Sequence, residues 1–184
     1  MLKRPYKKLY SKKDLARAVS RLGSEITPWC AQVWKESRVD VLAIPVLRGG
    51  LFFFADLVRA IDHSVEVLPL RATSYQAGVN GVQRPQVIAQ FDTIPAKGRH
   101  LLLVDDICDS GRTLKVLSEQ LWARGALAVR SAVLVKREVG EVTLAPDWVG
   151  FGYKGSEWLV GYGMEDAERW RNLPYVGMIE KEVS

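Results

Sequence analysis

The segment Leu101–Leu114, which reads LLLVDDICDSGRTL, can fold in few ways. Its apolar run Leu101–Val104 is typical of a parallel strand covered on both faces, and a helical pattern begins at Gly111. A Ser-Gly-Arg-Thr stretch that opens a helix offers hydroxyls and free backbone N–H groups to a phosphate. Phosphate alone does not need three aspartates beside it. The segment therefore predicts a ligand that also brings hydroxyls or cations, such as a sugar phosphate with Mg²⁺.

Strand-like apolar runs alternate with helical patterns on both sides of this segment. Helices are predicted over Ser11–Trp34, Leu51–Ile61 and Gly111–Arg124, and strands over Val39–Leu47, Val65–Leu70, Val87–Phe91 and Ala128–Val135. This order predicts an α/β fold with a parallel sheet flanked by helices. The loops after Leu47, Val104 and Val135 should then meet at the carboxyl edge of the sheet, where such folds bind ligands.

Three segments depart from this alternation. Pro28 is expected to bend the first helix or to split it in two. The stretch Arg71–Pro85 loses all periodicity and contains two glycines and an asparagine, which predicts a long mobile loop. The last part, Pro146–Ser184, holds scattered glycines and three of the six tryptophans. We interpret it as a hood over the sheet edge.

Composition favours one domain in a reducing compartment. At 184 residues, 48% of them hydrophobic, the chain suits a single domain, 1–184. The net charge is +5, but six basic residues lie within positions 1–13, which we interpret as a solvated, partly disordered arm. Cys30 and Cys108 lack the spacing of a zinc site, and no run is long enough to span a membrane. These features predict a cytoplasmic protein without a membrane partner, and nucleic acid is disfavoured as a partner.

Five segments resemble motifs of a known enzyme family. VDDICDSGRTL resembles the phosphoribosyl pyrophosphate (PRPP) signature of type I phosphoribosyltransferases. Within that class, VLRGGLFFFADL, RATSY, LVKRE and WLVGYGMEDAERWRNLPYVG are similar to the pyrophosphate loop, mobile loop, base-binding lysine and purine-binding segments of hypoxanthine-guanine (6-oxopurine) phosphoribosyltransferases. They occur in the family order from about Val39 to Met178. The resemblance implies the type I fold with a small hood, and a purine-salvage enzyme that transfers phosphoribose from PRPP to a 6-oxopurine and releases pyrophosphate.

The PRPP contacts implied by the resemblance lie in one run. They are Asp105, Asp106, Asp109, Ser110, Gly111, Arg112 and Thr113. Asp105 and Asp106 should face the ribose hydroxyls, and Mg²⁺ should bridge those hydroxyls and the pyrophosphate, so that the two carboxylates reach the metal through the hydroxyls or water. Asp109 should act as general acid/base near N7 of the purine. Helix capping could explain Asp109 or Ser110, but not two further acids. The chain has no GxxxxGK[ST] sequence, which counts against an ATPase or kinase.

Other parts of the chain would serve the leaving group and the lid. The implied pyrophosphate contacts are Leu47, Arg48, Gly49 and Arg171. The family has a non-proline cis peptide at the position between Leu47 and Arg48, and often a lysine in place of this arginine. Glu165 stands where the family usually has aspartate, which leaves a second Mg²⁺ contact there open. Ser74 and Tyr75 match the pair whose loop closes over the reacting centre. For Arg48 and for Arg171, an ordinary surface charge is the alternative.

The implied base contacts are Lys136, Trp158 and Leu159. Lys136 would donate to the 6-oxo group, which disfavours adenine because adenine presents a donor there. Trp158 would stack on the base, and the backbone around Leu159 would read the purine 2-position. A lysine at a strand end is also commonly just solvent-facing, and we interpret its neighbour Arg137 in that way.

Two rival functions stay open. One is a phosphoribosyltransferase for another base, such as uracil, and the preference among hypoxanthine, guanine and xanthine is also undetermined. The other is a regulator of the same fold that binds PRPP or nucleotide and contacts nucleic acid through the basic arm. The family usually forms dimers or tetramers, so a homo-oligomer is expected.

Overall fold

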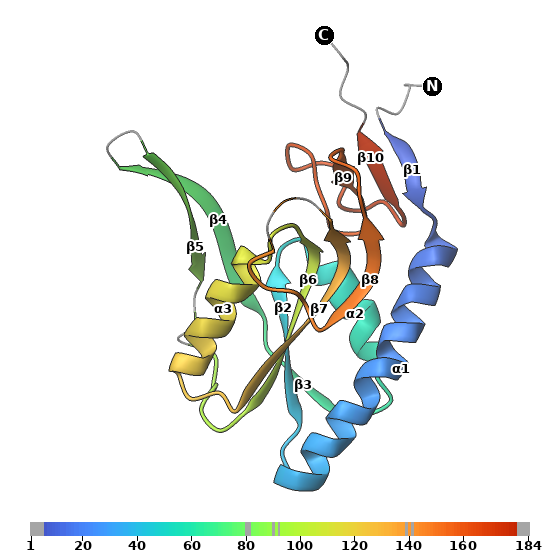
Figure 1. Ribbon diagram of the computed structural model, residues 1–184. Helices are drawn as coiled ribbons and strands as arrows, with labels where there is room; N and C mark the ends of the chain where they lie inside the picture. Colours follow the sequence, from blue (N-terminus) through green and yellow to red (C-terminus); the bar gives the residue numbers. More distant parts are fainter. Residues whose placement is uncertain are drawn as a thin grey trace.

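The computed structural model describes residues 6–79, 82–89, 91, 93–138, 140 and 142–179, with the backbone alone described over 72–79 and 82–89. The main sheet has the strand order β5-β4-β2-β6-β7-β8, and β3 pairs with β2 (Figure 1). Its strands are β2 (Val41–Leu47), β3 (Val65–Val67), β4 (Leu70–Val79), β5 (Val82–Ala89), β6 (His100–Cys108), β7 (Ala128–Arg137) and β8 (Trp148–Tyr153). All pairs in this sheet are parallel except β4 with β5. The predicted α/β class is confirmed.

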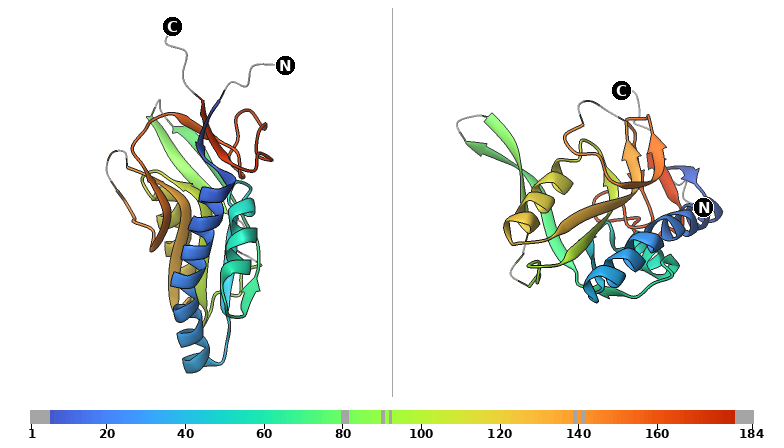
Figure 2. Two further views of the ribbon diagram at one scale, coloured as in Figure 1. Left: turned by 90° about the vertical axis from the view of Figure 1, so that its right-hand side faces the viewer. Right: turned by 60° about the horizontal axis from the view of Figure 1, so that its bottom comes forward.

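Helices cover both faces of the main sheet (Figure 2). α1 (Lys12–Ser37) and α2 (Leu51–Ala60) lie on one face, and α3 (Arg112–Ala123) lies on the other. A capping box starts α1: Ser11 Oγ accepts from Asp14 N at 3.2 Å, and Ser11 N donates to the Asp14 carboxylate at 2.9 Å. No helix in the described part of the chain is long and apolar enough to cross a membrane.

The buried core is divided by the sheet into two apolar clusters. Strand β2 contributes to both, because successive side chains of a strand point to opposite faces. Val41 and Ala43 belong to the cluster under α1 and α2, whereas Leu42 and Ile44 belong to the cluster under α3. This two-sided burial explains why β2 reads as a continuous apolar run.

The central strands β2, β6 and β7 are adjacent and parallel. The carboxyl ends of these strands therefore meet at one edge, as predicted for the segments after Leu47, Val104 and Val135. Strands β6 and β7 continue to Cys108 and Arg137, a few residues farther than the apolar runs indicate. The acidic residues of the PRPP signature thus begin inside a strand rather than after it.

A second, three-stranded antiparallel sheet forms the hood above this edge (Figure 1). Its strands, in spatial order, are β1 (Lys7–Tyr10), β10 (Val176–Ile179) and β9 (Trp158–Val160). The prediction of a solvated arm is wrong for Lys7–Tyr10, because this stretch pairs with β10 and the Tyr10 ring stacks on Phe151 at 4.0 Å. The predicted start of the hood at Pro146 is too early in the sequence, because Trp148–Tyr153 is strand β8 of the main sheet.

The predicted mobile loop over Arg71–Pro85 is instead most of a β-hairpin. Strands β4 and β5 pair antiparallel up to Val79 opposite Val82, and the ribbon extends away from the body (Figure 1). Asn80 and Gly81, which connect them, lie outside the described residues. An Asn-Gly pair between two strands is a strong hairpin signal, but it shows in local turn chemistry and not in apolar periodicity.

Helix α1 runs without a break through Pro28, so the predicted split is wrong. Proline removes one backbone hydrogen bond, but close packing of α1 against α2 holds the helix together. Gly23 marks a close approach of the two helices, since a Cβ there would lie 2.3 Å from the carbonyl oxygen of Ala60.

Candidate active site

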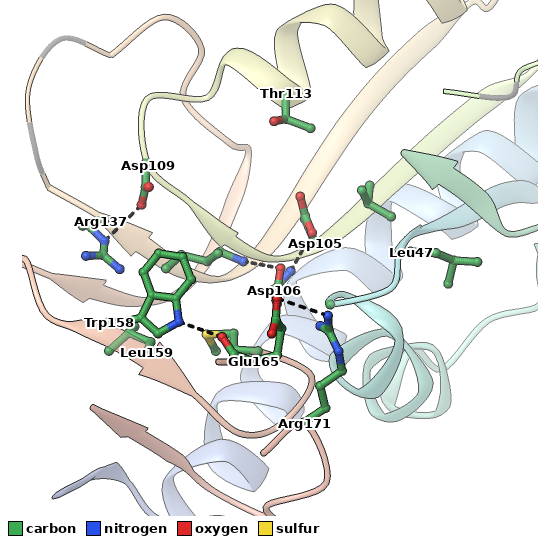
Figure 3. Close-up of a pocket in the computed structure, with 14 residues that line it drawn as sticks. Leu47, Asp105, Asp106, Asp109, Thr113, Arg137, Trp158, Leu159, Glu165 and Arg171 are labelled. Carbon is green, nitrogen blue, oxygen red and sulfur yellow. Dashed lines mark hydrogen bonds and ion pairs between the residues drawn. The ribbon is translucent and has the colours of Figure 1, made fainter. Parts of the chain in front are cut away.

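A cavity of about 310 Å³ opens between the carboxyl edge of the main sheet and the hood (Figure 3). Ten of the residues predicted from the sequence line it: Leu47, Gly49, Asp105, Asp106, Asp109, Thr113, Trp158, Leu159, Glu165 and Arg171. Five others adjoin it in the chain or contact its lining residues: Arg48, Ser110, Gly111, Arg112 and Lys136. The structure therefore brings the separate motifs into one site.

Asp105 and Asp106 lie side by side at the end of β6 and are half-buried. Asp106 N donates to Asp105 Oδ1 at 3.0 Å, which holds the pair in place. Removal from water raises the pKa of both carboxyls, and for Asp105 the charge of Asp106 raises the pKa further. Gly49 packs directly on this pair, since a Cβ there would lie 2.1 Å from Asp106 Oδ2. This arrangement favours a ligand that brings protons, hydroxyls or cations to the acidic pair.

The Ser110–Thr113 turn leads from β6 into α3. Gly111 is the N-cap residue with φ 81°, and it makes no side-chain cap bond. Asp109 is therefore not the N-cap residue, so the capping alternative is wrong for it. Ser110 Oγ accepts from the backbone N–H of Arg112, the first residue of α3, at 3.4 Å, so a capping contact stays for Ser110. A Cβ on Gly111 would lie 1.9 Å from Leu144 O, and Thr143 N donates to Ser110 O at 2.7 Å. The loop after β7 thus supports the turn from behind, and the turn stands at the N-terminus of α3, where the helix dipole favours an anion.

The pyrophosphate segment begins with a cis peptide bond between Leu47 and Arg48, as the resemblance implied. The Arg48 guanidinium forms an ion pair with Glu168 of the hood. Arg171 donates from Nη1 to Gly163 O at 2.7 Å, and its Nη2 lies 3.5 Å from Glu165 Oε1. The structure thus places both predicted pyrophosphate arginines beside hood carboxylates.

Trp158 and Leu159 lie in β9 and line the cavity from the hood side (Figure 3). The Trp158 side chain is 55% exposed, and its Nε1 donates to Glu165 O at 2.7 Å. One edge of the indole is therefore fixed while the ring is still open to a ligand. Leu159 is buried, so its backbone rather than its side chain is suited to contact a base.

Lys136 and Arg137, the last residues of β7, both hold Asp109. Lys136 Nζ donates to the backbone carbonyls of Asp109 and of Arg137, the latter at 3.0 Å. Arg137 Nε lies 3.0 Å from Asp109 Oδ1, and its Nη1 donates to Glu157 O at 3.0 Å. Arg137 is buried and lines the cavity, so interpreting it as a surface charge was wrong. Its contacts come from distant segments, and strand alternation alone gives no signal for them.

We expect Arg137→Gln to lower kcat about tenfold, because the Asp109 carboxylate loses its buried partner and its fixed orientation. The KM for PRPP should change less, since this guanidinium pairs with Asp109 and with the Glu157 carbonyl. Steady-state kinetics beside Arg124→Gln, an exposed arginine at the end of α3, provides the control. Equal kinetics for the two variants would contradict a role for Arg137 in the site.

Ser74 and Tyr75 lie on β4, opposite Val87 and Gln86 of β5. Their side chains are outside the described part of the chain, so the structure places only their backbone. The hairpin that carries them leaves the main sheet at its carboxyl edge, next to β2. Their role in a closing segment stays a prediction.

A parallel sheet with the Ser-Gly-Arg-Thr turn, an acidic pair and a hood at one edge is the arrangement expected of the phosphoribosyltransferase class. The phosphoribosyl transferase domain model matches residues 16–166. The hypoxanthine-guanine phosphoribosyltransferase of Streptococcus pyogenes serotype M3 is 35% identical over 176 residues, which cover 95% of this chain and 93% of the relative. The enzyme of the same name from Bacillus subtilis is 34% identical, with coverage of 96% and 94%. The chain belongs to the hypoxanthine-guanine phosphoribosyltransferase family.

Solved structures agree with this assignment. The hypoxanthine phosphoribosyltransferase of Trypanosoma cruzi, in complex with its product IMP, matches with a TM-score of 0.81 at 25% identity, over 97% of this chain and 96% of that one. A hypoxanthine-guanine phosphoribosyltransferase from Bacillus anthracis matches with a TM-score of 0.75 at 28% identity, over 95% and 98%. The similarity therefore extends over nearly the whole of both chains.

Proposed function

We propose that this chain transfers the phosphoribosyl group from PRPP to a 6-oxopurine in a Mg²⁺-dependent reaction of purine salvage. Hypoxanthine and guanine are the expected acceptors, with xanthine a further candidate, and the products are the nucleoside monophosphate and pyrophosphate. One observation carries the proposal: the pyrophosphate segment, the acidic pair with its phosphate turn, and the hood all border one cavity. The names of the relatives, and the IMP complex of one of them, support the same reaction.

The donor half of the site is built by β6 and the start of α3. The Ser110–Thr113 turn would hold the 5′-phosphate of PRPP with hydroxyls and backbone N–H groups. Asp105 and Asp106 would accept from the ribose 2′- and 3′-hydroxyls. Arg48 and Arg171 would bind the pyrophosphate group, because guanidinium groups match the geometry of phosphate oxygens.

The acidic pair also suits Mg²⁺. Carboxylates at the mouth of a cavity, with pKa values raised by burial, would be stabilised in the ionised form by a cation. Among the residues that the structure describes, no three His, Cys, Asp or Glu side chains form a complete metal cage, so substrate oxygens and water would complete the shell. When bound, Mg²⁺ would neutralise charge on the leaving pyrophosphate. Glu165 contacts Arg171 and the backbone N–H of Glu168, so we assign it to the hood loop and not to the metal.

Asp109 would handle the proton of the acceptor. In the proposed reaction, N9 of the purine forms the bond to the anomeric carbon while the bond from that carbon to pyrophosphate breaks. Asp109 accepts the proton that the purine loses at N7, and Arg137 keeps the carboxylate oriented. The anomeric carbon carries positive charge during this exchange, so water must be excluded. Closure of the β4–β5 ribbon, with Ser74 and Tyr75, would exclude it.

Lys136 should set the selectivity for 6-oxopurines. Its ammonium has three N–H donors, and two carbonyl contacts leave one for the 6-oxo group. We expect Lys136→Ala to raise the KM for hypoxanthine and guanine about tenfold to a hundredfold, with a smaller change in the KM for PRPP. Discrimination against adenine should fall in the same variant.

A panel of hypoxanthine, guanine, xanthine, adenine and uracil at fixed PRPP measures this selectivity directly. Lys115→Ala, which removes an exposed lysine of α3, is the matched control. If uracil or adenine were the preferred acceptor of the unaltered protein, the proposed substrate class would be wrong. If Lys136→Ala left the base KM values unchanged, only the role of the lysine would be wrong.

On the family resemblance we extend the proposal to a cytoplasmic homo-oligomer, a dimer or a tetramer. Sedimentation velocity of the purified protein tests the oligomeric part, and a monomer at micromolar concentration would contradict it.

A further inference from the structure

The hood carboxylate of Glu168 lies between the two arginines that we assign to pyrophosphate. Its Oε1 forms an ion pair with Arg48 Nη2, and its Oε2 lies 3.4 Å from Arg171 Nη2. Arg48 comes from the turn after β2 and Arg171 from the hood, so the carboxylate links two parts of the site that are far apart in sequence. A carboxylate between two guanidinium groups resembles the contacts that a phosphate would make there.

The position of Glu168 is fixed by its loop. Its backbone has φ 62°, and its N–H donates to Glu165 Oε2 at 2.5 Å. Arg171 is anchored independently through Gly163 O at 2.7 Å. The side chains of Glu168 and Arg48 are each 62% exposed, whereas that of Arg171 is 23% exposed. The carboxylate can therefore leave the arginines by a side-chain rotation, without a change in the core.

We propose that Glu168 is an internal counter-anion, which occupies the place of pyrophosphate between Arg48 and Arg171 and is displaced when the pyrophosphate group binds. This inference rests on the proposed function, because it needs pyrophosphate as the ligand of the two arginines. Glu168 is then an affinity-determining residue: it keeps the arginines neutralised in the free protein and weakens the binding of both PRPP and pyrophosphate.

The electrostatics agree with this role. Hydrogen bonding to Arg48, and then the charges of both arginines, lower the pKa of Glu168, so the side chain is ionised at neutral pH. An incoming pyrophosphate group must break both contacts before it makes its own. Exposed ion pairs of this kind are individually weak, so the expected effect is moderate and not an all-or-none block.

The test is Glu168→Gln, which keeps the shape of the side chain and removes its charge. We expect the Kd for inorganic pyrophosphate, measured by titration calorimetry, and the KM for PRPP to fall about fivefold. The KM for the purine base should stay the same. In an Arg48→Gln background the effect of Glu168→Gln should be smaller, because one of its two partners is gone.

Glu25→Gln is the matched control, since it removes the carboxylate partner of another exposed arginine, Arg21, at 2.8 Å on α1. If Glu168→Gln bound pyrophosphate no more tightly than Glu25→Gln, or less tightly than the unaltered protein, the counter-anion role would be overturned. In that case the unaltered protein would still bind pyrophosphate and form nucleotide. If the unaltered protein did neither, the proposed function itself would fail and this inference with it.

Discussion

Replacing Asp109 with asparagine should lower kcat by about a hundredfold to ten-thousandfold, the usual contribution of a general acid/base. Asparagine has nearly the same shape, so the contacts around it should survive, but it cannot accept the purine proton. The structure places the carboxylate at the cavity and holds it with Arg137 at 3.0 Å. The Kd for PRPP should change less than kcat, because asparagine keeps the size and the hydrogen-bonding oxygen of the side chain. Single-turnover kinetics with hypoxanthine separates the chemical step from binding and from product release.

The control for this variant is Asp62→Asn, which changes an exposed aspartate beyond the end of α2. It should leave the rate of the chemical step unchanged. Comparison with Lys136→Ala separates a loss of acid/base catalysis from a loss of binding, because that variant should act mainly on the affinity for the base. Identical losses in kcat and in base KM for Asp109→Asn and Lys136→Ala would contradict the separate roles of these two residues.

Asp105→Asn should make the free protein more stable and should weaken its binding of PRPP. Burial first, and then the charge of Asp106, raise the pKa of Asp105 well above its usual value. Ionising Asp105 therefore costs more in the folded state than in the unfolded state, and a side chain that stays neutral removes this cost. Each kcal/mol gained would raise Tm by about 2–4 °C in a chain of this size. PRPP affinity should fall about tenfold to a hundredfold, since a charged acceptor for a ribose hydroxyl is lost.

The direction of the pKa shift of Asp105 determines how the Tm difference between Asp105→Asn and the unaltered protein changes with pH. The pKa of Asp105 is higher in the folded than in the unfolded state, so the destabilisation is fully present above the folded-state pKa. It disappears as the pH falls through that value toward the unfolded value of about 3.9. The Tm advantage of Asp105→Asn should thus grow as the pH rises toward the folded-state pKa of Asp105, and should shrink on acidification. A Tm difference that grew as the pH fell, or a less stable variant at neutral pH, would show that the acidic pair is not under electrostatic strain.

Local pattern was sufficient for most of the sheet and for the donor half of the site. Leu101–Val104 is buried on both faces, and its apolar run therefore predicts a central strand. The polar residues that follow such a run lie at the carboxyl edge of the sheet, where these folds bind ligands. The same logic placed Asp105, Asp106 and Thr113 at the cavity. These features depend on short stretches of chain, whose periodicity carries the information.

Features that depend on distant contacts were not predictable in this way. The first strand was interpreted as a solvated arm, because six basic residues lie within positions 1–13. The contacts that order it, the stacking of Tyr10 on Phe151 and the pairing of β1 with β10, are made with residues far away in the sequence. The β4–β5 hairpin has no apolar periodicity, although its Asn80-Gly81 turn sequence carried a usable signal.

Arg137 and Glu168 show the same limit within the site. Lys136 and Arg137 are neighbouring cations at the end of β7. Arg137 is held by Asp109 and by the Glu157 carbonyl of the hood, and both of these partners lie outside the strand. Glu168 meets Arg48 only because the hood folds over the turn after β2. A sequence pattern identifies such residues as charged, but the fold decides which charges meet.

The most direct test of the account is product formation by the purified protein from PRPP with hypoxanthine or guanine in the presence of Mg²⁺. The account predicts the corresponding nucleoside monophosphate, with one pyrophosphate released for each nucleotide formed, and little or no product from adenine. If neither oxopurine gave a nucleotide under these conditions, the assignment of this site to phosphoribosyl transfer onto 6-oxopurines would be contradicted.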